Sequence, residues 1–505
     1  MRSLVLPEDI WQCVASFVPY DDLAALISIN RAWYNIALDA RYREIHWDKV
    51  DVSMTRTLVR LRTPSVAARV RRLHVRAWFI EYLINKESQE SPSYVESSKR
   101  WVSRHFRMPS TPPRVAPSAS GKSSAARDII ESMTQAVRLM TQVTEYSFEW
   151  RDLSPTADTL RFLSAARSAF GVSLRKLTLH AQLDNFTSLL STVDFDNLEE
   201  LELSFDHDRN VSPHSANLLR NAIAPFVNHF RRSISGLLIS SASKADLSPL
   251  LHELQEFPHL HKFVARFAFD AEHLSDPRGL VNILRLNSET LSSVEVGRAF
   301  AGTSDDTREP PSTWGAFSLA LEDSRAVLSN LEALRIPALT TFDATLACLR
   351  RSGDTLTSLH LVDHFLRDDE VVALLQVFAH RPFDAGLQTL YVGLMNLTVE
   401  TLDLLASRLP GLQDLNLVLA STTVQDIVHR DSSPSMFCVG LVAHFYHDWA
   451  LHNIGVWEKR FIATPISSRE EKALMEHIAR CVPSIQTFKG EPKSVGVPCR
   501  YWDAS

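Results

Sequence analysis

Residues 387–417, LQTLYVGLMNLTVETLDLLASRLPGLQDLNL, contain two copies of one short apolar pattern separated by an amphipathic segment. The first copy places apolar residues at Leu387, Leu390 and Val392, and the second at Leu412, Leu415 and Leu417. In each copy the last two apolar residues are two positions apart, so they share one face of a strand and the residue between them points to the other face. Residues 399–409 carry apolar residues at the three-and-four spacing of a helix. The stretch therefore predicts a strand, a helix and a second strand.

The same pattern recurs along most of the chain. Clear copies are Leu174/Leu177/Leu179, Leu198/Leu201/Leu203, Ile234/Leu237/Ile239, Leu291/Val294/Val296, Leu331/Leu334/Ile336 and Leu356/Leu359/Leu361. Weaker copies are Val70/Leu73/Val75, Val143/Tyr146/Phe148, Leu260/Phe263/Ala265, Leu451/Ile454/Val456 and Ile485/Phe488. Segments with helical spacing lie between several of them, at residues 215–230, 247–257, 368–378 and 468–478.

One strand and one helix per unit, repeated at this spacing, is the pattern of leucine-rich repeats. The predicted fold is α/β: an irregular leucine-rich-repeat solenoid with parallel strands on its concave face and helices on its convex face. A doubly wound α/β sheet would also alternate strands and helices. The fixed three-point spacing and the scarcity of glycine, 15 of 505 residues, favour the solenoid.

Charge and cysteine content exclude several classes of protein. The chain has 53 basic and 59 acidic residues, a formal net charge of −6, so no global positive field would attract nucleic acid or an anionic membrane. Five widely spaced cysteines without a CxxC argue against a disulfide framework and a structural zinc site. An acidic pair stands where a signal peptide would be apolar, and no run of about 18 apolar residues occurs. We expect a cytoplasmic or nuclear protein.

Motifs that carry chemistry are scarce. Residues 116–123, APSASGKS, match a phosphate loop only loosely and lie in a proline-rich tract. His444, His447 and His452 are the densest group of metal-ligand residues, but their spacing fits no zinc motif, and aromatic neighbours indicate an end cap. GxSxG, HExxH and GxGxxG are absent. The sequence therefore predicts no catalytic residue, no cofactor, no metal site and no enzyme.

The N-terminal segment has a different pattern. Residues 4–47 contain three short helical stretches with apolar faces, which include Ile10, Val14, Leu23, Leu26 and Trp33. About 40 residues are too few for a stable core without a partner. The segment therefore predicts an apolar surface that docks on another protein.

This segment resembles an F-box. The matching residues are Leu6, Pro7, Ile10, Phe17, Pro19, Leu23, Leu26, Arg31, Trp33 and Tyr34, with mild departures at Asp9, Val18 and Asn30. The resemblance implies binding to the Skp adaptor and, through it, to a cullin. The adaptor-binding residues would be Leu6, Pro7, Ile10, Val14, Phe17, Pro19, Leu23, Leu26 and Trp33. In the alternative interpretation the three helices only cap the first strand of the solenoid.

The predicted organisation has four parts. Residues 1–48 form the F-box, residues 49–85 a linker with the first repeat strand, residues 86–127 a disordered insertion rich in serine and proline, and residues 128–505 the repeats with a C-terminal cap.

The predicted function is that of a non-catalytic substrate-recognition subunit of a Skp/cullin/F-box ubiquitin ligase, which holds an unknown protein substrate on the concave face. Residues beside the buried apolar positions would bind it: Arg72, Arg76, Lys176, His180, Glu200, Glu202, Lys262, Arg266, Arg335, His360, Tyr391, Asp414 and Asn416. Their mixed signs suit a protein better than a phosphate backbone. One alternative is a leucine-rich-repeat scaffold, adaptor-bound or free, with no ubiquitination target. The other is an enzyme whose site escapes motif analysis.

Overall fold

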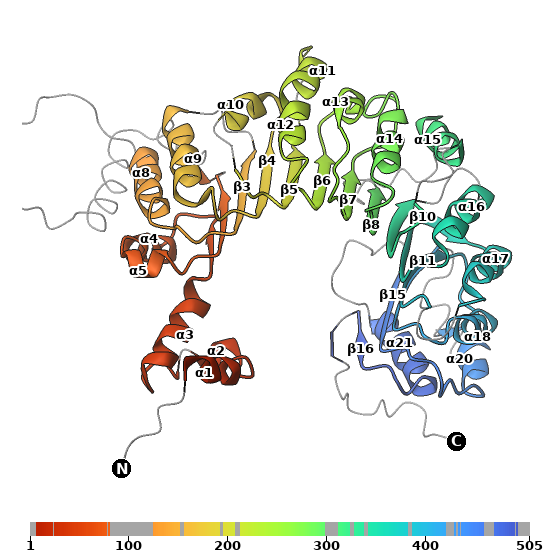
Figure 1. Ribbon diagram of the computed structural model, residues 1–505. Coiled ribbons are helices and arrows are strands. Elements are labelled where there is room, and N and C mark those ends of the chain that lie inside the picture. Colours follow the sequence, from red (N-terminus) through yellow and green to blue (C-terminus); the bar gives the residue numbers. More distant parts are fainter. Residues whose placement is uncertain are drawn as a thin grey trace, which may run out of the picture. The chain divides into compact units, whose positions relative to one another are not determined.

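The computed structural model describes residues 7–23, 25–77, 79–80, 125–151, 156–191, 195–207, 213–297, 312–323, 328–337, 342–381, 386–420, 429–430, 433–434, 436–458, 469–489 and 491–492. The chain divides into two compact units, Met1–Ile234 and Ser235–Ser505. Each unit is an α/β assembly in which strands alternate with helices (Figure 1).

The first unit begins with three short helices, α1 (Glu8–Ala15), α2 (Tyr20–Leu23) and α3 (Arg31–Tyr42). Asn30 caps α3, because its side-chain oxygen accepts a hydrogen bond of 2.9 Å from the backbone N–H of Trp33. The helices share a small core of Ala15, Leu23 and Trp33, against which Trp11 and further apolar residues pack. The three predicted helical stretches are therefore present and packed on one another.

Five parallel strands follow in the order of the sequence. They are β1 (Glu44–Trp47), β2 (Arg72–Arg76), β3 (Glu145–Arg151), β4 (Lys176–Ala181) and β5 (Glu200–Phe205). Strands β2 to β5 are the predicted ones, with Leu73, Tyr146, Leu177 and Leu201 side by side in register. Strand β1 was not predicted, because it lacks the upstream leucine of the pattern.

Helices connect these strands. They are α4 (Val52–Leu61), α5 (Pro64–Ala67), α8 (Ala125–Val137), α9 (Ala157–Phe170), η1 (Leu183–Asn185), α10 (Phe186–Leu190), α11 (Ser215–Leu218), η2 (Leu219–Ile223) and α12 (Ala224–His229). The helix predicted over residues 215–230 is interrupted by a π-helical turn, η2, just before Pro225. Proline has no N–H to donate, so the regular helical bonding changes upstream of it.

The described residues of the second unit form nine further parallel strands. They are β6 (Gly236–Ser241), β7 (Lys262–Arg266), β8 (Ser293–Gly297), β9 (Ala333–Pro337), β10 (Ser358–Leu366), β11 (Thr389–Leu394), β12 (Asp414–Leu419), β15 (Asn453–Glu458) and β16 (Thr487–Phe488). Strand β17 (Glu491–Pro492) pairs antiparallel with β16, and β13 (His429–Arg430) pairs antiparallel with β14 (Ser433–Pro434).

The helices of the second unit lie along one side of its strands (Figure 1). They are α13 (Ser248–Glu253), α14 (Arg278–Leu286), α15 (Ser312–Asp323), α16 (Phe342–Ser352), α17 (Asp368–Phe378), α18 (Val399–Arg408), α20 (Met436–Leu441) and α21 (Arg469–Cys481). Helix α17 has the predicted bounds, whereas α13 ends at Glu253, before the predicted end at residue 257.

The core of each unit consists of the repeated apolar positions. The predicted triplets are buried from Val70 to Phe488, and the leucines of the second unit stack from strand to strand, as Leu334, Leu359, Leu390 and Leu415 do. Each buried leucine contributes about 1.5–3 kcal/mol through removal of apolar surface from water. The prediction of parallel strands joined by helices in a repeating α/β architecture is confirmed.

One predicted boundary can be compared with the described residues. The insertion predicted at residues 86–127 lies outside them, except that α8 begins at Ala125, before the predicted border. None of the described helices combines the length and apolar character needed to cross a membrane.

Candidate functional site

The face of the strands opposite the buried leucines carries polar side chains in rows. In the second unit, register pairing aligns one residue from each of six neighbouring strands. We call this set the central row; it consists of Glu295, Arg335, His360, Tyr391, Asn416 and Gly455. The row exists because parallel strands of equal register place equivalent residues about 4.8 Å apart.

One end of the central row is charged. Arg266 of β7 donates two hydrogen bonds to the carboxylate of Glu295, of 2.7 and 3.0 Å, and Arg335 lies 3.3 Å from the same carboxylate. Burial alone would raise the pKa of Glu295, but the hydrogen bonds from Arg266 and the charge of Arg335 lower it. Glu295 is therefore an anion that holds two guanidinium groups on this surface.

The other end of the row is aromatic. The rings of His360 and Tyr391 are 3.7 Å apart between centroids, and Tyr391 lies 5.8 Å from Trp457. Lys489 Nζ lies 4.8 Å from the Trp457 ring centre and 2.8 Å from a carboxylate oxygen of Glu471. Burial lowers the pKa of His360 to about 3, and the charge of Arg335 acts in the same direction. His360 is therefore a neutral imidazole.

Gly455 permits the position of Trp457. A Cβ atom at residue 455 would lie 2.2 Å from Cη2 of Trp457 and 2.5 Å from Oδ1 of Asn416. Only a residue without a side chain leaves the indole this place over the row. Trp457 is two residues further along β15, but its indole lies over Gly455 and so extends the aromatic end of the central row.

This combination suits protein binding. Aromatic residues and arginine are enriched at protein interfaces and supply most of their binding energy, whereas a catalytic site needs converging nucleophiles and bases. Five of the predicted substrate-binding residues are brought together here: Arg266, Arg335, His360, Tyr391 and Asn416. Lys262 and Asp414 belong to a separate row, in which four strands lie between them.

Three residues of this surface were missed by the sequence analysis. Glu295 lies between Val294 and Val296, so the rule that selected its neighbours in the row would have found it. Trp457 and Lys489 carry no sequence signal, because their positions depend on Gly455 and on packing near the last strands.

In the first unit, the predicted substrate-binding residues form ion pairs and hydrogen bonds with residues on neighbouring strands. Arg72 pairs with Glu145 at 3.1 Å, and Lys176 pairs with Glu200 at 3.1 Å. Similar contacts join Arg76 with Glu149, His180 with Asp206, and Thr178 with Glu202, and Arg72 also pairs with Glu44 at 3.2 Å. Such exposed ion pairs each contribute about 0–1 kcal/mol. This face is thus a ladder of opposite charges that offset each other across neighbouring strands.

The N-terminal helices expose part of the predicted docking surface. Ile10 and Val14 are exposed on α1, and Phe17, just after it, is 83% exposed. Pro7 and Pro19 are also exposed and Leu26 is half-buried, whereas Leu6 lies outside the described residues. Leu23 and Trp33, by contrast, are only 8% and 4% exposed, because they form the core of the three helices.

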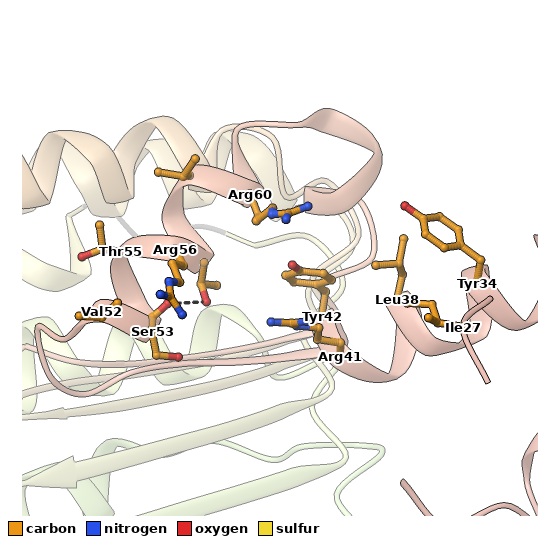
Figure 2. Close-up of a pocket in the computed structure, with 12 residues that line it drawn as sticks. Ile27, Tyr34, Leu38, Arg41, Tyr42, Val52, Ser53, Thr55, Arg56 and Arg60 are labelled. Atoms are coloured by element: carbon orange, nitrogen blue, oxygen red, sulfur yellow. Dashed lines mark hydrogen bonds between the residues drawn. The ribbon is translucent and has the colours of Figure 1, made fainter. Parts of the chain in front are cut away.

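A groove lies between α3 and α4, with a volume of about 750 Å³ (Figure 2). Arg41, Arg56 and Arg60 line it and form no ion pair with other described residues. Figure 2 shows Arg41 beside the ring of Tyr42, 5.7 Å from its centre. Chemically, this groove can accept carboxylate or phosphate groups. The sequence analysis missed it, because residues 49–85 were expected to form a linker and a strand, whereas α4 forms one side of the groove.

Comparisons with known proteins add little. No protein-family model matches the chain, and no curated protein does. Among solved structures, the chain is similar to the Rad7–Elc1 complex of yeast, with 13% identity and a TM-score of 0.33 over 82% of this chain and 85% of that one. It is also similar to the leucine-rich-repeat-containing protein LegL7 of Legionella pneumophila, with 16% identity and a TM-score of 0.32 over 70% of this chain and 96% of that one. At these scores neither likeness carries an argument, so the fold rests on the strands and helices described above.

Proposed function

We propose that this protein is a non-catalytic substrate-recognition subunit of a Skp/cullin/F-box ubiquitin ligase. One observation carries the proposal: an exposed apolar surface on a three-helix segment that already has its own core. Ile10, Val14 and Phe17 contribute this surface, and covering each would stabilise a complex by up to about 1.5–3 kcal/mol. The F-box resemblance of the same residues identifies the expected partner as the Skp adaptor.

Leu23 and Trp33 have a different role in this proposal from the exposed residues. These two residues hold the helices together, and the docking surface consists of the exposed residues around α1. A preformed surface loses less conformational entropy on binding than one that orders during binding.

The central row is the proposed substrate site. It offers a charged end at Glu295 and Arg335 and an aromatic end at Tyr391 and Trp457. In such a ligase the receptor contributes positioning, because it holds the target near the enzyme that transfers ubiquitin and so raises its effective concentration. No catalytic group of this chain is required.

Adaptor binding can be tested with the double variant Ile10→Glu/Val14→Glu. The new charges would be desolvated without partners at the interface, so we expect the purified adaptor to bind at least about 100-fold more weakly. The matched control is Val172→Glu, because Val172 is 71% exposed and lies outside the N-terminal helices. Adaptor binding by the double variant at the strength of the control would refute the proposal.

Substrate capture needs a separate test. Tyr391→Ala and Arg335→Glu should leave adaptor binding unchanged and reduce recovery of a target protein, measured by proximity labelling in cells. A scaffold with no ubiquitination target is the alternative. It would bind the adaptor, but no captured partner would accumulate when the protein is deleted.

A further inference from the structure

Two histidines stand side by side at the start of the first unit's sheet. Parallel pairing of β1 with β2 places Glu44 opposite Arg72 and His46 opposite His74. The two imidazole rings are stacked, with centroids 4.6 Å apart and planes inclined by only 7°. These histidines are far apart in the sequence, so only the strand pairing brings them together.

A carboxylate converges on both rings. Glu44 Oε1 lies 2.8 Å from Nε2 of His46 and 3.5 Å from Nε2 of His74. All three ligand atoms lie within 4.8 Å of one another. Tetrahedral zinc with bonds of about 2.0–2.1 Å holds its ligand atoms about 3.3 Å apart, which is close to the two separations between Glu44 and the histidines. To bind one ion, the two rings must rotate out of their stacked arrangement, because the lone pair of each Nε2 atom lies in the plane of its ring.

We propose that Glu44, His46 and His74 form a binding site for a divalent transition-metal ion of the zinc class. Two imidazole nitrogens and one carboxylate oxygen are the donors that Zn²⁺ accepts readily, and a set of three leaves the fourth position to water. None of the three residues belongs to the proposed adaptor surface or to the central row.

The surroundings of Glu44 support this arrangement. Arg72 lies 3.2 Å from Glu44 Oε2, the oxygen that faces away from the histidines, and so orients Oε1 toward them. Such contacts behind a ligand are common in metal sites. The positive charge of Arg72 is balanced by Glu145, which accepts a hydrogen bond of 3.1 Å from Arg72 Nε.

A bound ion would link β1 to β2. Strand β1 follows α3 after a single residue, Arg43, and is only four residues long. Cross-strand coordination would therefore stabilise the place where the N-terminal helices join the repeats. We expect the metal to raise thermal stability, since a ligand at free concentration c that binds only the folded state stabilises it by RT ln(1 + c/Kd).

The test uses the untagged full-length chain, freed of metal with a chelator and titrated with ZnCl₂ in a calorimeter. We expect one saturable site with a Kd of about 1–10 µM, which His46→Gln/His74→Gln weakens at least about 100-fold. Zinc should raise the melting temperature of the wild type but not that of the double variant. Circular dichroism before addition of zinc confirms that the variant is folded.

The chain contains 19 histidines, so the control must exclude adventitious binding. His252→Gln is suitable, because His252 pairs with Asp276 at 3.0 Å in the other unit and should leave the zinc site intact. Cobalt substitution adds a spectroscopic check, since tetrahedral Co²⁺ absorbs strongly in the visible range and this band should vanish in the double variant. Equal zinc affinity in the wild type and the double variant, or no saturable binding, would overturn the proposal.

Discussion

Mild acidification should destabilise the second unit through His360. The imidazole packs 3.7 Å from Tyr391, and its Nε2 atom is buried without a hydrogen-bond partner among the described residues. Its pKa falls from 6.5 to about 3, mainly because of burial. The charge of Arg335 also lowers the pKa, and the charge of Glu295 raises it by a smaller amount. In the unfolded chain the same group takes up a proton near pH 6.5.

The sign and size of the effect follow from proton linkage. Between the folded and unfolded pKa values only the unfolded state binds the proton, so stability is complete above pH 6.5 and falls as the pH decreases. From pH 6.5 to pH 5.0 the full shift would cost about 2 kcal/mol, and partial exposure of the ring reduces this to about 1–2 kcal/mol.

The assay compares urea-unfolding midpoints at pH 6.5 and pH 5.0 for the wild type and His360→Gln. Glutamine is neutral at both values, so the variant should lose less stability on acidification, by about 1–2 kcal/mol. Other titrating groups contribute equally to both proteins and cancel. His252→Gln, at an exposed ion pair, is the matched control and should behave as the wild type. Equal pH dependence in the wild type and His360→Gln would refute the reasoning.

Three further predictions concern packing in the second unit. Lys489→Met leaves the carboxylate of Glu471 buried without its ammonium partner, so unfolding free energy should fall by about 3–5 kcal/mol, and Lys489→Met/Glu471→Leu should recover most of it in urea titrations. Gly455→Ala should displace the indole of Trp457 and increase acrylamide quenching of its fluorescence, with Gly455→Ala/Trp457→Phe as the reference. Leu359→Ala should cost about 2–5 kcal/mol by leaving a cavity in the core, and a loss below about 1 kcal/mol would contradict the assigned burial.

The repeated strands were predictable because their signal is local. Each triplet, such as Leu356, Leu359 and Leu361, fixes which side chains face the core, and a slip of one residue would expose them all. The positions facing the open side followed directly, which is why Arg335 and Tyr391 were both assigned to the concave face. The three N-terminal helices were predictable from apolar spacing, but the spacing did not distinguish Trp33 in their core from Phe17 on their surface.

The period, the strands and the face of each strand were thus predictable from local patterns, because the apolar spacing that marks a buried face involves residues close together in the chain. Which side chains from different strands meet depends on the folded arrangement. Strand β1 has four residues and forms because β2 supplies its hydrogen bonds, and that pairing brings His46 beside His74. Trp457 joins the central row because Gly455 leaves room for its indole. Such contacts depend on register and on the space left by neighbours, which no local pattern of residues specifies.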